Sequence, residues 1–288
     1  MLQLDAEVKH ELKSNGYRPG KLLGSGVYGY VYVACKKNKC HHAVKIAMAR
    51  EEIDRSVAER DYFFLHRLQS SRLVPHLYAQ FDSPNYYFLV MQRFESNLQA
   101  RVEQRIEKLP SSIRISLEKQ GLMCHGVFLT DELTQIFALA RWLGSKGIVH
   151  GDLKFDQFLY AVHKHTLVVT DFGFAGLISK KSPVPDMGWS CNIESGHLLP
   201  WKWCPPGPMV HLKTIQDAID FNLWQLEANF FYYSNGVYLI YNDDTTKYTL
   251  FGGLLETKQL QSNYHLKHYV DKSYWVFRKA MLERFSKV

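Results

Sequence analysis

The sequence has no apolar run that approaches the length of a membrane-spanning helix, which needs about 20 consecutive apolar residues. Its start, MLQLDAEVKHELK, lacks the basic beginning, apolar stretch and small-residue cleavage site of a signal peptide. Internal repeats and low-complexity linkers are also absent. These absences predict an intracellular protein, cytoplasmic or nuclear, without a membrane partner.

Cysteine is scarce, with five residues in 288. Their irregular spacing does not suit a disulfide framework, so we expect a reducing compartment. Cys35 and Cys40 lie beside His41 and His42, but this spacing matches no common zinc pattern. We interpret them as partly exposed strand residues around a hairpin tip at 36–39.

Charge of one sign is only mildly in excess, with 35 lysines and arginines against 28 acidic residues and a net charge of +7. This balance permits attraction to acidic proteins or nucleic acid. Because the basic residues are scattered, we expect an ordinary solvated surface and no direct nucleic-acid binding. We also expect a monomer.

Hydrophobic periodicity predicts strands before residue 91 and mainly helices after residue 97. The expected strands lie within about 17–48 and at 77–81, 86–91, 157–162 and 166–170. The expected helices cover about residues 50–69, 130–146, 217–232 and 272–286. The sequence therefore predicts one α+β domain over 1–288. It comprises a sheet lobe at about 15–91, a hinge at about 91–96, and a helical lobe at about 97–288 with an insertion near 100–128.

A glycine-rich segment, GSGVYG, places Gly24, Gly26 and Gly29 within the β-rich region. Glycines let backbone N–H groups approach phosphates closely. A strand follows the segment, which argues against a dinucleotide-binding fold, where a helix would follow. Sixteen residues after Gly29, Lys45 lies in the apolar strand AVKI and needs an anionic partner, which nucleotide phosphates would provide.

A carboxylate from the helix after Lys45 would hold this lysine in place. We favour Glu59 because of its longer reach. Asp61 is the alternative, since it sits better relative to Leu65 and Leu68. The two lie on different faces of the helix, so both cannot serve.

A second cluster, HGDLKFDQ, covers residues 150–157, and its Asp152 precedes Asp171 of an Asp-Phe-Gly tripeptide by nineteen residues. Asp152 would orient or accept the proton of a substrate hydroxyl, and Lys154 would neutralise charge on the transferring phosphoryl group. Asp171 would hold Mg²⁺ against the β- and γ-phosphates. Behind the glycine-rich segment and Lys45, this order and spacing indicates phosphoryl transfer from ATP.

In this arrangement the sequence resembles the protein kinase superfamily over about residues 17–232. The resemblance implies a bilobal α+β fold, with an antiparallel sheet and one main helix in one lobe, a mostly helical second lobe, and ATP between them. Residues 91–99 and the HGDLK segment are similar to the casein-kinase-1 group, and within it to the vaccinia-related kinases and their poxvirus relatives. That similarity suggests a viral origin.

The resemblance also assigns site residues. The implied catalytic residues are Asp152, Lys154 and Lys45, and the implied ligands of Mg²⁺ (or Mn²⁺) are Asp171 and Gln157. The implied ATP-binding residues are Gly24, Gly26, Gly29, Val31, Ala43, Lys45, Glu59, Met91, Gln92, Phe94 and Leu159. Asp220, at the expected start of a helix, would brace the catalytic loop from beneath.

Three departures from the family pattern affect the expected activity. Gln157 replaces an asparagine and moves the carboxamide by about 1.5 Å, which predicts weaker metal binding. Gly151 replaces an arginine, and residues 174–202 contain no Thr or Tyr, so we expect activity without activation-loop phosphorylation at Ser179 or Ser182. The segment WCPPG at 203–207 lacks the glutamate of the family's Ala-Pro-Glu.

These residues predict a serine/threonine protein kinase that acts on protein hydroxyls, because Lys154 is the choice typical of that class. A pseudokinase that binds ATP and regulates a partner is the main alternative, on account of Gln157. A small-molecule phosphotransferase is a third reading, since His150-Gly151-Asp152 resembles the aminoglycoside kinase motif.

Overall fold

The computed structural model describes residues 4–26, 28–113, 128–160, 166–178, 214–235, 238–242 and 247–251. Its contacts divide the chain into two compact units. The first unit comprises Met1–Ser96 and Leu159–Ala175, and the second comprises Asn97–Phe158 and Gly176–Val288. Residues 159–175 thus group with the N-terminal unit, whereas the sequence predicted a single boundary near residue 96.

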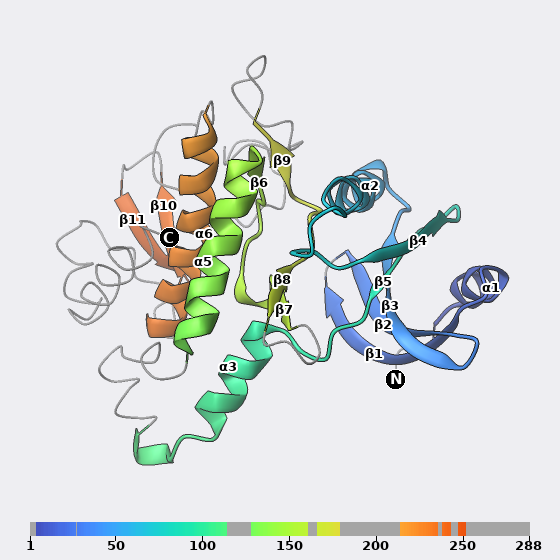
Figure 1. Ribbon diagram of the computed structural model, residues 1–288, viewed down its shortest axis with the longest axis horizontal. Coiled ribbons are helices and arrows are strands. Elements are labelled where there is room, and N and C mark those ends of the chain that lie inside the picture. Colours follow the sequence, from blue (N-terminus) through green and yellow to red (C-terminus); the bar gives the residue numbers. More distant parts are fainter. Residues whose placement is uncertain are drawn as a thin grey trace. The chain divides into compact units, whose positions relative to one another are not determined.

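The first unit is built on a five-stranded antiparallel sheet in the order β1-β2-β3-β5-β4 (Figure 1). The strands are β1 (Arg18–Gly26), β2 (Gly29–Lys36), β3 (Lys39–Met48), β4 (Leu77–Asp82) and β5 (Tyr86–Gln92). Valine and aromatic residues, which favour pleated half-buried surfaces, form half of β2 and four of the seven residues of β5, and β3 contributes Val44 and Ile46. The predicted strands of this region are therefore confirmed.

Helix α1 (Ala6–Ser14) covers one face of this sheet and was not predicted. Only Val8 and Leu12 are buried in a helix that is otherwise charged, so its apolar periodicity is weak. Both side chains join a core cluster on the sheet. That cluster consists of Val8, Leu12, Tyr17, Tyr32, Ala34, Val44, Ile46, Tyr86, Phe88 and Val90.

The turn between β4 and β5 is held from two sides. From α1, Glu7 accepts hydrogen bonds from Ser83 Oγ at 2.6 Å and from Asn85 Nδ2 at 2.7 Å. From the opposite side, Arg55 forms an ion pair with Asp82 at 3.1 Å and donates to the Ser83 carbonyl at 3.2 Å. Arg55 belongs to α2 (Glu52–Arg67), the main helix of this unit, which confirms the helix predicted at 50–69.

The second unit contains paired helices. Its helices are α3 (Leu98–Glu107), α5 (Thr130–Ser145) and α6 (Ile215–Asn235), with the short 3₁₀ turn η1 (Phe155–Gln157). Helices α5 and α6 confirm the predictions at 130–146 and 217–232. They approach so closely that a Cβ on Gly144 would lie 2.6 Å from Ile219 Cα.

Short strands complete the two units. β6 (Ile148–Val149) pairs with β9 (Gly176–Leu177), and β7 (Phe158–Tyr160) pairs with β8 (Leu167–Val169). A hairpin of β10 (Tyr238–Asn242) and β11 (Lys247–Phe251), which was not predicted, follows α6. The helix expected at 272–286, residues 114–127 of the expected insertion, and Ser179, Ser182 and Cys204 lie outside the described residues.

Cys35 and Cys40 lie in strands on either side of the predicted hairpin tip, but they form a disulfide across the β2–β3 hairpin, which the expectation from the irregular cysteine spacing did not include. The cysteines meet because Lys36 pairs with Lys39 at the end of the hairpin, a register that spacing alone does not reveal. Within the described ranges, no group of three or more His, Cys, Asp or Glu side chains is placed to hold a metal ion. None of the described helices is long and apolar enough to cross a bilayer.

Candidate active site

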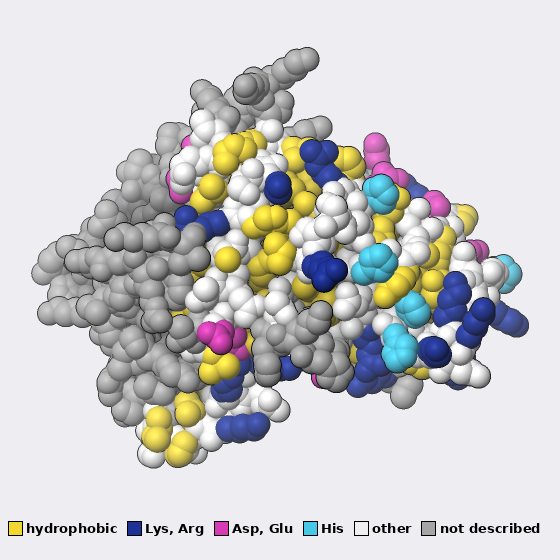
Figure 2. All heavy atoms as spheres, viewed as in Figure 1, with side chains coloured by type: hydrophobic (Ala, Val, Ile, Leu, Met, Phe, Trp, Pro, Cys, Tyr) yellow, Lys and Arg dark blue, Asp and Glu magenta, His cyan; other side chains and the backbone are white. Residues whose placement is uncertain are grey.

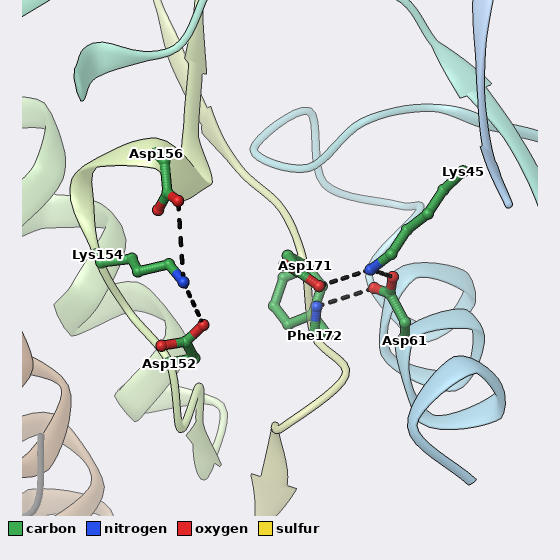
Figure 3. Close-up of polar contacts among 7 residues, drawn as sticks. All are labelled: Lys45, Asp61, Asp152, Lys154, Asp156, Asp171 and Phe172. Atoms are coloured by element: carbon green, nitrogen blue, oxygen red, sulfur yellow. Dashed lines mark hydrogen bonds and ion pairs between the residues drawn. The ribbon is translucent and has the colours of Figure 1, made fainter. Parts of the chain in front are cut away.

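Lys45 of β3 lies between two carboxylates of the first unit (Figure 3). Its Nζ donates to Asp61 Oδ2 and to Asp171 Oδ1, both at 2.6 Å. The Asp61 side chain is 1% exposed, whereas the Asp171 side chain is 39% exposed. Asp61 is therefore the internal anchor of Lys45, and Asp171 is the carboxylate that solvent or a ligand can reach.

The backbone at Asp171 is in the left-handed region, with φ +65°. That conformation costs a residue with a side chain about 1–2 kcal/mol and persists only where the surroundings impose it. The next residue supplies the constraint, since the Phe172 N–H donates to Asp61 Oδ1 at 2.8 Å. The Phe172 ring is fully buried and stacks near Phe64 of α2 at 6.2 Å between centroids. One carboxylate on α2 thus positions both Lys45 and the peptide after Asp171.

The partner of Lys45 is Asp61 and not Glu59, which corrects our preference. Helix positions two residues apart lie about 200° apart, and α2 turns Val57, Phe64 and Asp61 toward the core while Glu59 is exposed. Because α2 packs against β3, the shorter aspartate side chain is long enough. The inward apolar periodicity of the helix was the signal that pointed to Asp61.

Charge within this triad shifts the ionisation of its members. Burial acts to lower the pKa of Lys45, but the carboxylates of Asp171 and Asp61 outweigh it and raise that pKa, so the amine stays protonated. Burial raises the pKa of Asp61, and the neighbouring charge of Asp171 acts in the same direction. The Lys45 ammonium and the Phe172 N–H oppose that rise.

Every residue predicted to bind ATP lies in the first unit. The glycines of the predicted phosphate loop differ in their surroundings: a Cβ on Gly24 or Gly26 would meet nothing within 4 Å. A Cβ on Gly29, where φ is +153°, would lie 2.1 Å from the Ile46 carbonyl oxygen. Gly29 is thus required by the close approach of β3, whereas Gly24 and Gly26 leave open space.

The predicted adenine-side residues follow the strand register. Val31 pairs with Lys45 across β2 and β3, and Ala43 pairs with Met91 across β3 and β5. Leu159 is half-buried in β7, and the side chains of Met91 and Phe94 are buried. The Gln92 N–H donates to the His76 carbonyl at 2.7 Å. This bond occupies the Gln92 N–H.

The loop between β6 and η1 carries Asp152 and Lys154 in the second unit. Lys154 Nζ lies 2.8 Å from Asp152 Oδ2 and 3.8 Å from Asp156 Oδ2 (Figure 3). The Lys154 side chain is 31% exposed and that of Asp152 is 10% exposed. The lysine therefore shields a carboxylate that stays accessible at one edge.

Amide side chains of α6 hold this loop. Asn222 Oδ1 accepts the His150 N–H at 3.0 Å, and Asn222 Nδ2 donates to the Ile148 carbonyl at 2.9 Å. Gln225 Oε1 accepts the Leu153 N–H at 3.3 Å, and Asn229 Nδ2 donates to the Leu153 carbonyl at 3.1 Å. The three positions recur at i, i+3 and i+7, so they form one stripe of the helix.

Asp220 does not brace the loop, which corrects the role implied by the family resemblance. Its side chain is exposed and accepts a hydrogen bond from Gln216 Nε2 at 2.7 Å. Asn222 lies about 200° further around α6 and takes the inward position. Polar residues that recur at helical spacing at 222, 225 and 229, among apolar neighbours, were the available signal.

The residues predicted to bind a metal offer hard oxygen ligands. Asp171 supplies a carboxylate and Gln157, buried in η1, supplies a carboxamide. Mg²⁺ is usually held by one or two carboxylates together with substrate phosphates and water. The lack of a larger ligand cluster among the described residues is compatible with that mode of binding.

Comparison with known proteins identifies the class. The family described as "Protein kinase domain" matches residues 17–194, which is more than half of the chain. The chain therefore belongs to the protein kinase family, and the α+β kinase-like fold is confirmed.

Curated relatives of the chain are serine/threonine kinases. The chain is 30% identical over 173 residues to testis-specific serine/threonine-protein kinase 4 of Homo sapiens, covering 59% of this chain and 48% of that protein. It is 25% identical over 173 residues to serine/threonine-protein kinase sck2 of Schizosaccharomyces pombe, covering 58% of this chain and 24% of the relative. The matched region thus spans about half or less of these relatives.

Proposed function

We propose that the protein transfers the γ-phosphate of ATP to serine or threonine hydroxyls of protein substrates. The observation that carries the proposal is the Asp61–Lys45–Asp171 triad. In it, buried Asp61 positions a lysine cation next to the exposed carboxylate of Asp171, an arrangement suited to anionic phosphates and a metal. The left-handed conformation of Asp171 beside this cation supports the proposal, because such backbone conformations cluster at functional sites.

In the proposed reaction, Lys45 binds the α- and β-phosphates and the open space at Gly24 and Gly26 admits the phosphate chain. Asp152 accepts the proton of the substrate hydroxyl. The hydroxyl oxygen bonds to the γ-phosphorus while the bond between the γ-phosphorus and ADP breaks. Lys154 balances negative charge on the transferring group. Mg²⁺ or Mn²⁺, held by Asp171 and Gln157, would neutralise phosphate charge.

Four finer features belong to the same proposal. The protein acts as an intracellular monomer, and it needs no phosphorylation at Ser179 or Ser182. Its similarity to the casein-kinase-1 and vaccinia-related branch, with the suggested viral origin, stays a prediction based on residues 91–99 and the HGDLK segment. A large rate gain on phosphorylation of either serine would refute the prediction that activity needs no phosphorylation there.

Phosphate transfer from radiolabelled ATP to casein and histone, with Mg²⁺ or Mn²⁺, tests the proposal. Lys45→Met and Asp152→Ala should each abolish transfer. The exposed Lys108→Met and Glu59→Ala are matched controls and should retain it. Phosphoamino-acid analysis should find phosphoserine or phosphothreonine, and an aminoglycoside substrate should not be labelled.

A nucleotide-binding scaffold is the second candidate, because Gln157 replaces the asparagine expected at the metal. That function predicts no transfer with either metal, combined with a melting temperature that ATP still raises. Transfer with Mn²⁺ alone would instead identify Gln157 as a weakened ligand in a working enzyme.

A further inference from the structure

The net positive charge of the chain resides in one segment. Residues 12–50 contain eight lysines and arginines and no acidic residue, whereas the rest of the chain carries 27 basic and 28 acidic residues. The segment forms the end of α1 and strands β1 to β3, which are neighbours in the sheet. The basic residues are therefore gathered by the fold, contrary to our expectation of a scattered distribution.

Six of these cations form what we call the basic hairpin surface. They are exposed, and none forms an ion pair with an acidic side chain within the described residues. The six are Lys13, Arg18, Lys21, Lys36, Lys37 and Lys39. Figure 2 shows Lys, Arg and His side chains gathered over this part of the first unit, with few acidic side chains among them.

The hairpin presents its lysines at a cost in stability. Lys36 pairs directly with Lys39, and like charges opposite each other destabilise a sheet. Lys37 and Asn38 have φ of +48° and +63°, the combination of a two-residue turn that favours Asn and Gly over lysine. The Cys35–Cys40 disulfide links the two strands behind this turn. The lysines are thus held in place, which is expected of a preformed binding surface.

Aromatic rings continue from the basic hairpin surface across the sheet. Lys36 Nζ lies 4.7 Å from the Tyr17 ring, which is 5.9 Å from His42. The ring of Tyr78 is 4.6 Å from His42 and 4.7 Å from His76, and Tyr78 is 49% exposed. Histidines support this tyrosine edge-on on two sides. A half-exposed ring, joined to Lys36 through the rings of His42 and Tyr17, offers a stacking platform on the same sheet as the exposed cations.

We propose that the basic hairpin surface and Tyr78 together bind single-stranded nucleic acid without sequence preference. Lysines neutralise the phosphates as point charges, and Tyr78 stacks on a base. Five of the six cations are lysines, which suits backbone contacts better than the paired contacts that arginine makes with a carboxylate or phosphate. An acidic protein segment would satisfy the charge but offers a ring only where it contains an aromatic residue, whereas every nucleotide carries a base that can stack on Tyr78. The proposal is independent of the kinase reaction.

Binding of a fluorescent single-stranded oligonucleotide of about 12 nucleotides, a length within known site sizes, tests this inference. Anisotropy would be measured between about 50 and 200 mM salt, the range over which phosphate contacts weaken most visibly. Lys36→Glu, Lys37→Glu and Lys39→Glu combined should reduce the affinity at least tenfold and lower the salt slope by about 2. A matched triple variant at exposed sites elsewhere, Arg72→Glu, Lys108→Glu and Lys146→Glu, should retain most of the affinity.

Two single variants separate charge from stacking and from folding. Tyr78→Leu should weaken binding about tenfold and leave the salt slope unchanged, because it removes no charge. Lys37→Asn should melt at the same or a higher temperature than the wild type, since asparagine suits the turn, yet bind more weakly. This second variant keeps the test valid should the triple variant not fold.

Three outcomes would overturn the inference. The first is an absence of oligonucleotide binding at about 50 mM salt. The second is an equal loss of affinity in the two triple variants, which would reduce the effect to net charge. The third is displacement of the oligonucleotide by polyglutamate at lower concentration than by unlabelled oligonucleotide, which would assign the surface to an acidic protein segment.

Discussion

Substituting Asp61 by asparagine tests the reasoning about the triad most directly. The wild-type carboxylate uses one oxygen for the Lys45 ammonium and the other for the Phe172 N–H. Asparagine has the same shape but only one acceptor oxygen, so its NH₂ group must face one of the two donors. The substitution therefore removes one hydrogen bond and leaves a buried donor unsatisfied.

The magnitude follows from burial. A charge-assisted hydrogen bond contributes about 1.5–3 kcal/mol, and an orphaned buried donor costs about 1–3 kcal/mol. Lys45 keeps Asp171 at 2.6 Å, so the full cost of an unpaired buried cation is not reached. We expect the free energy of unfolding to fall by about 2–3 kcal/mol, which lowers the melting temperature by about 5–10 °C in a domain of this size.

Circular dichroism melts of Asp61→Asn and Glu59→Gln provide the comparison. Glu59 is exposed, and its substitution should change the free energy of unfolding by less than about 0.5 kcal/mol. Melting temperatures of Asp61→Asn and wild type within about one degree would refute the reasoning. A larger loss from Glu59→Gln than from Asp61→Asn would refute it as well.

Three further predictions concern packing, the loop brace and pH. Gly144→Ala should lose about 1–2 kcal/mol in urea unfolding despite its better helix propensity, because its Cβ would meet the Ile219 backbone at 2.6 Å. Asn222→Asp should lose at least about 2 kcal/mol by the same measurement, since a carboxylate oxygen would replace the donor that now meets the Ile148 carbonyl. A hydrogen bond from Tyr86 is the chief cause that lowers the pKa of Asp5 below its ordinary 3.8. A hydrogen bond from Ser83 is the chief cause that lowers the pKa of Glu7 below its ordinary 4.5. The contribution of these two carboxylates to holding α1 is therefore complete above about pH 5 and is lost as pH falls through the lowered pKa values. NMR signals of the α1 amides would report this loss. The double variant Asp5→Asn with Glu7→Gln should abolish the transition.

Much of the fold could be predicted because its elements are periodic. β5 is buried at six of its seven positions and reads as an apolar run, and α5 repeats apolar residues at helical spacing. Helix α1 was not predicted because two buried residues among nine give little apolar periodicity. The β10–β11 hairpin was missed although the segment NDDTT at 242–246 is a turn signal between two apolar runs.

The site was predictable in its residue types and less so in its geometry. Lys45, Asp152 and Asp171 stand out because their spacing is specific. The choice between Glu59 and Asp61 depends on the rotation of α2 about its axis, which reach alone does not determine. Asn222 was missed because an acidic residue two positions earlier fitted the family pattern, although an amide can both accept and donate at once.

Both α1 and α2 hold the β4–β5 turn, and this affects where a shortened version of the protein can begin. The family match begins at residue 17, so a trimmed version designed on it would omit α1. Such a fragment would lose Glu7 and uncover the apolar side chains of Val44, Ile46, Phe88 and Val90. An exposed apolar patch on a sheet promotes aggregation. The smallest part of this region that folds as a soluble unit therefore begins before the family boundary, at Asp5 or earlier.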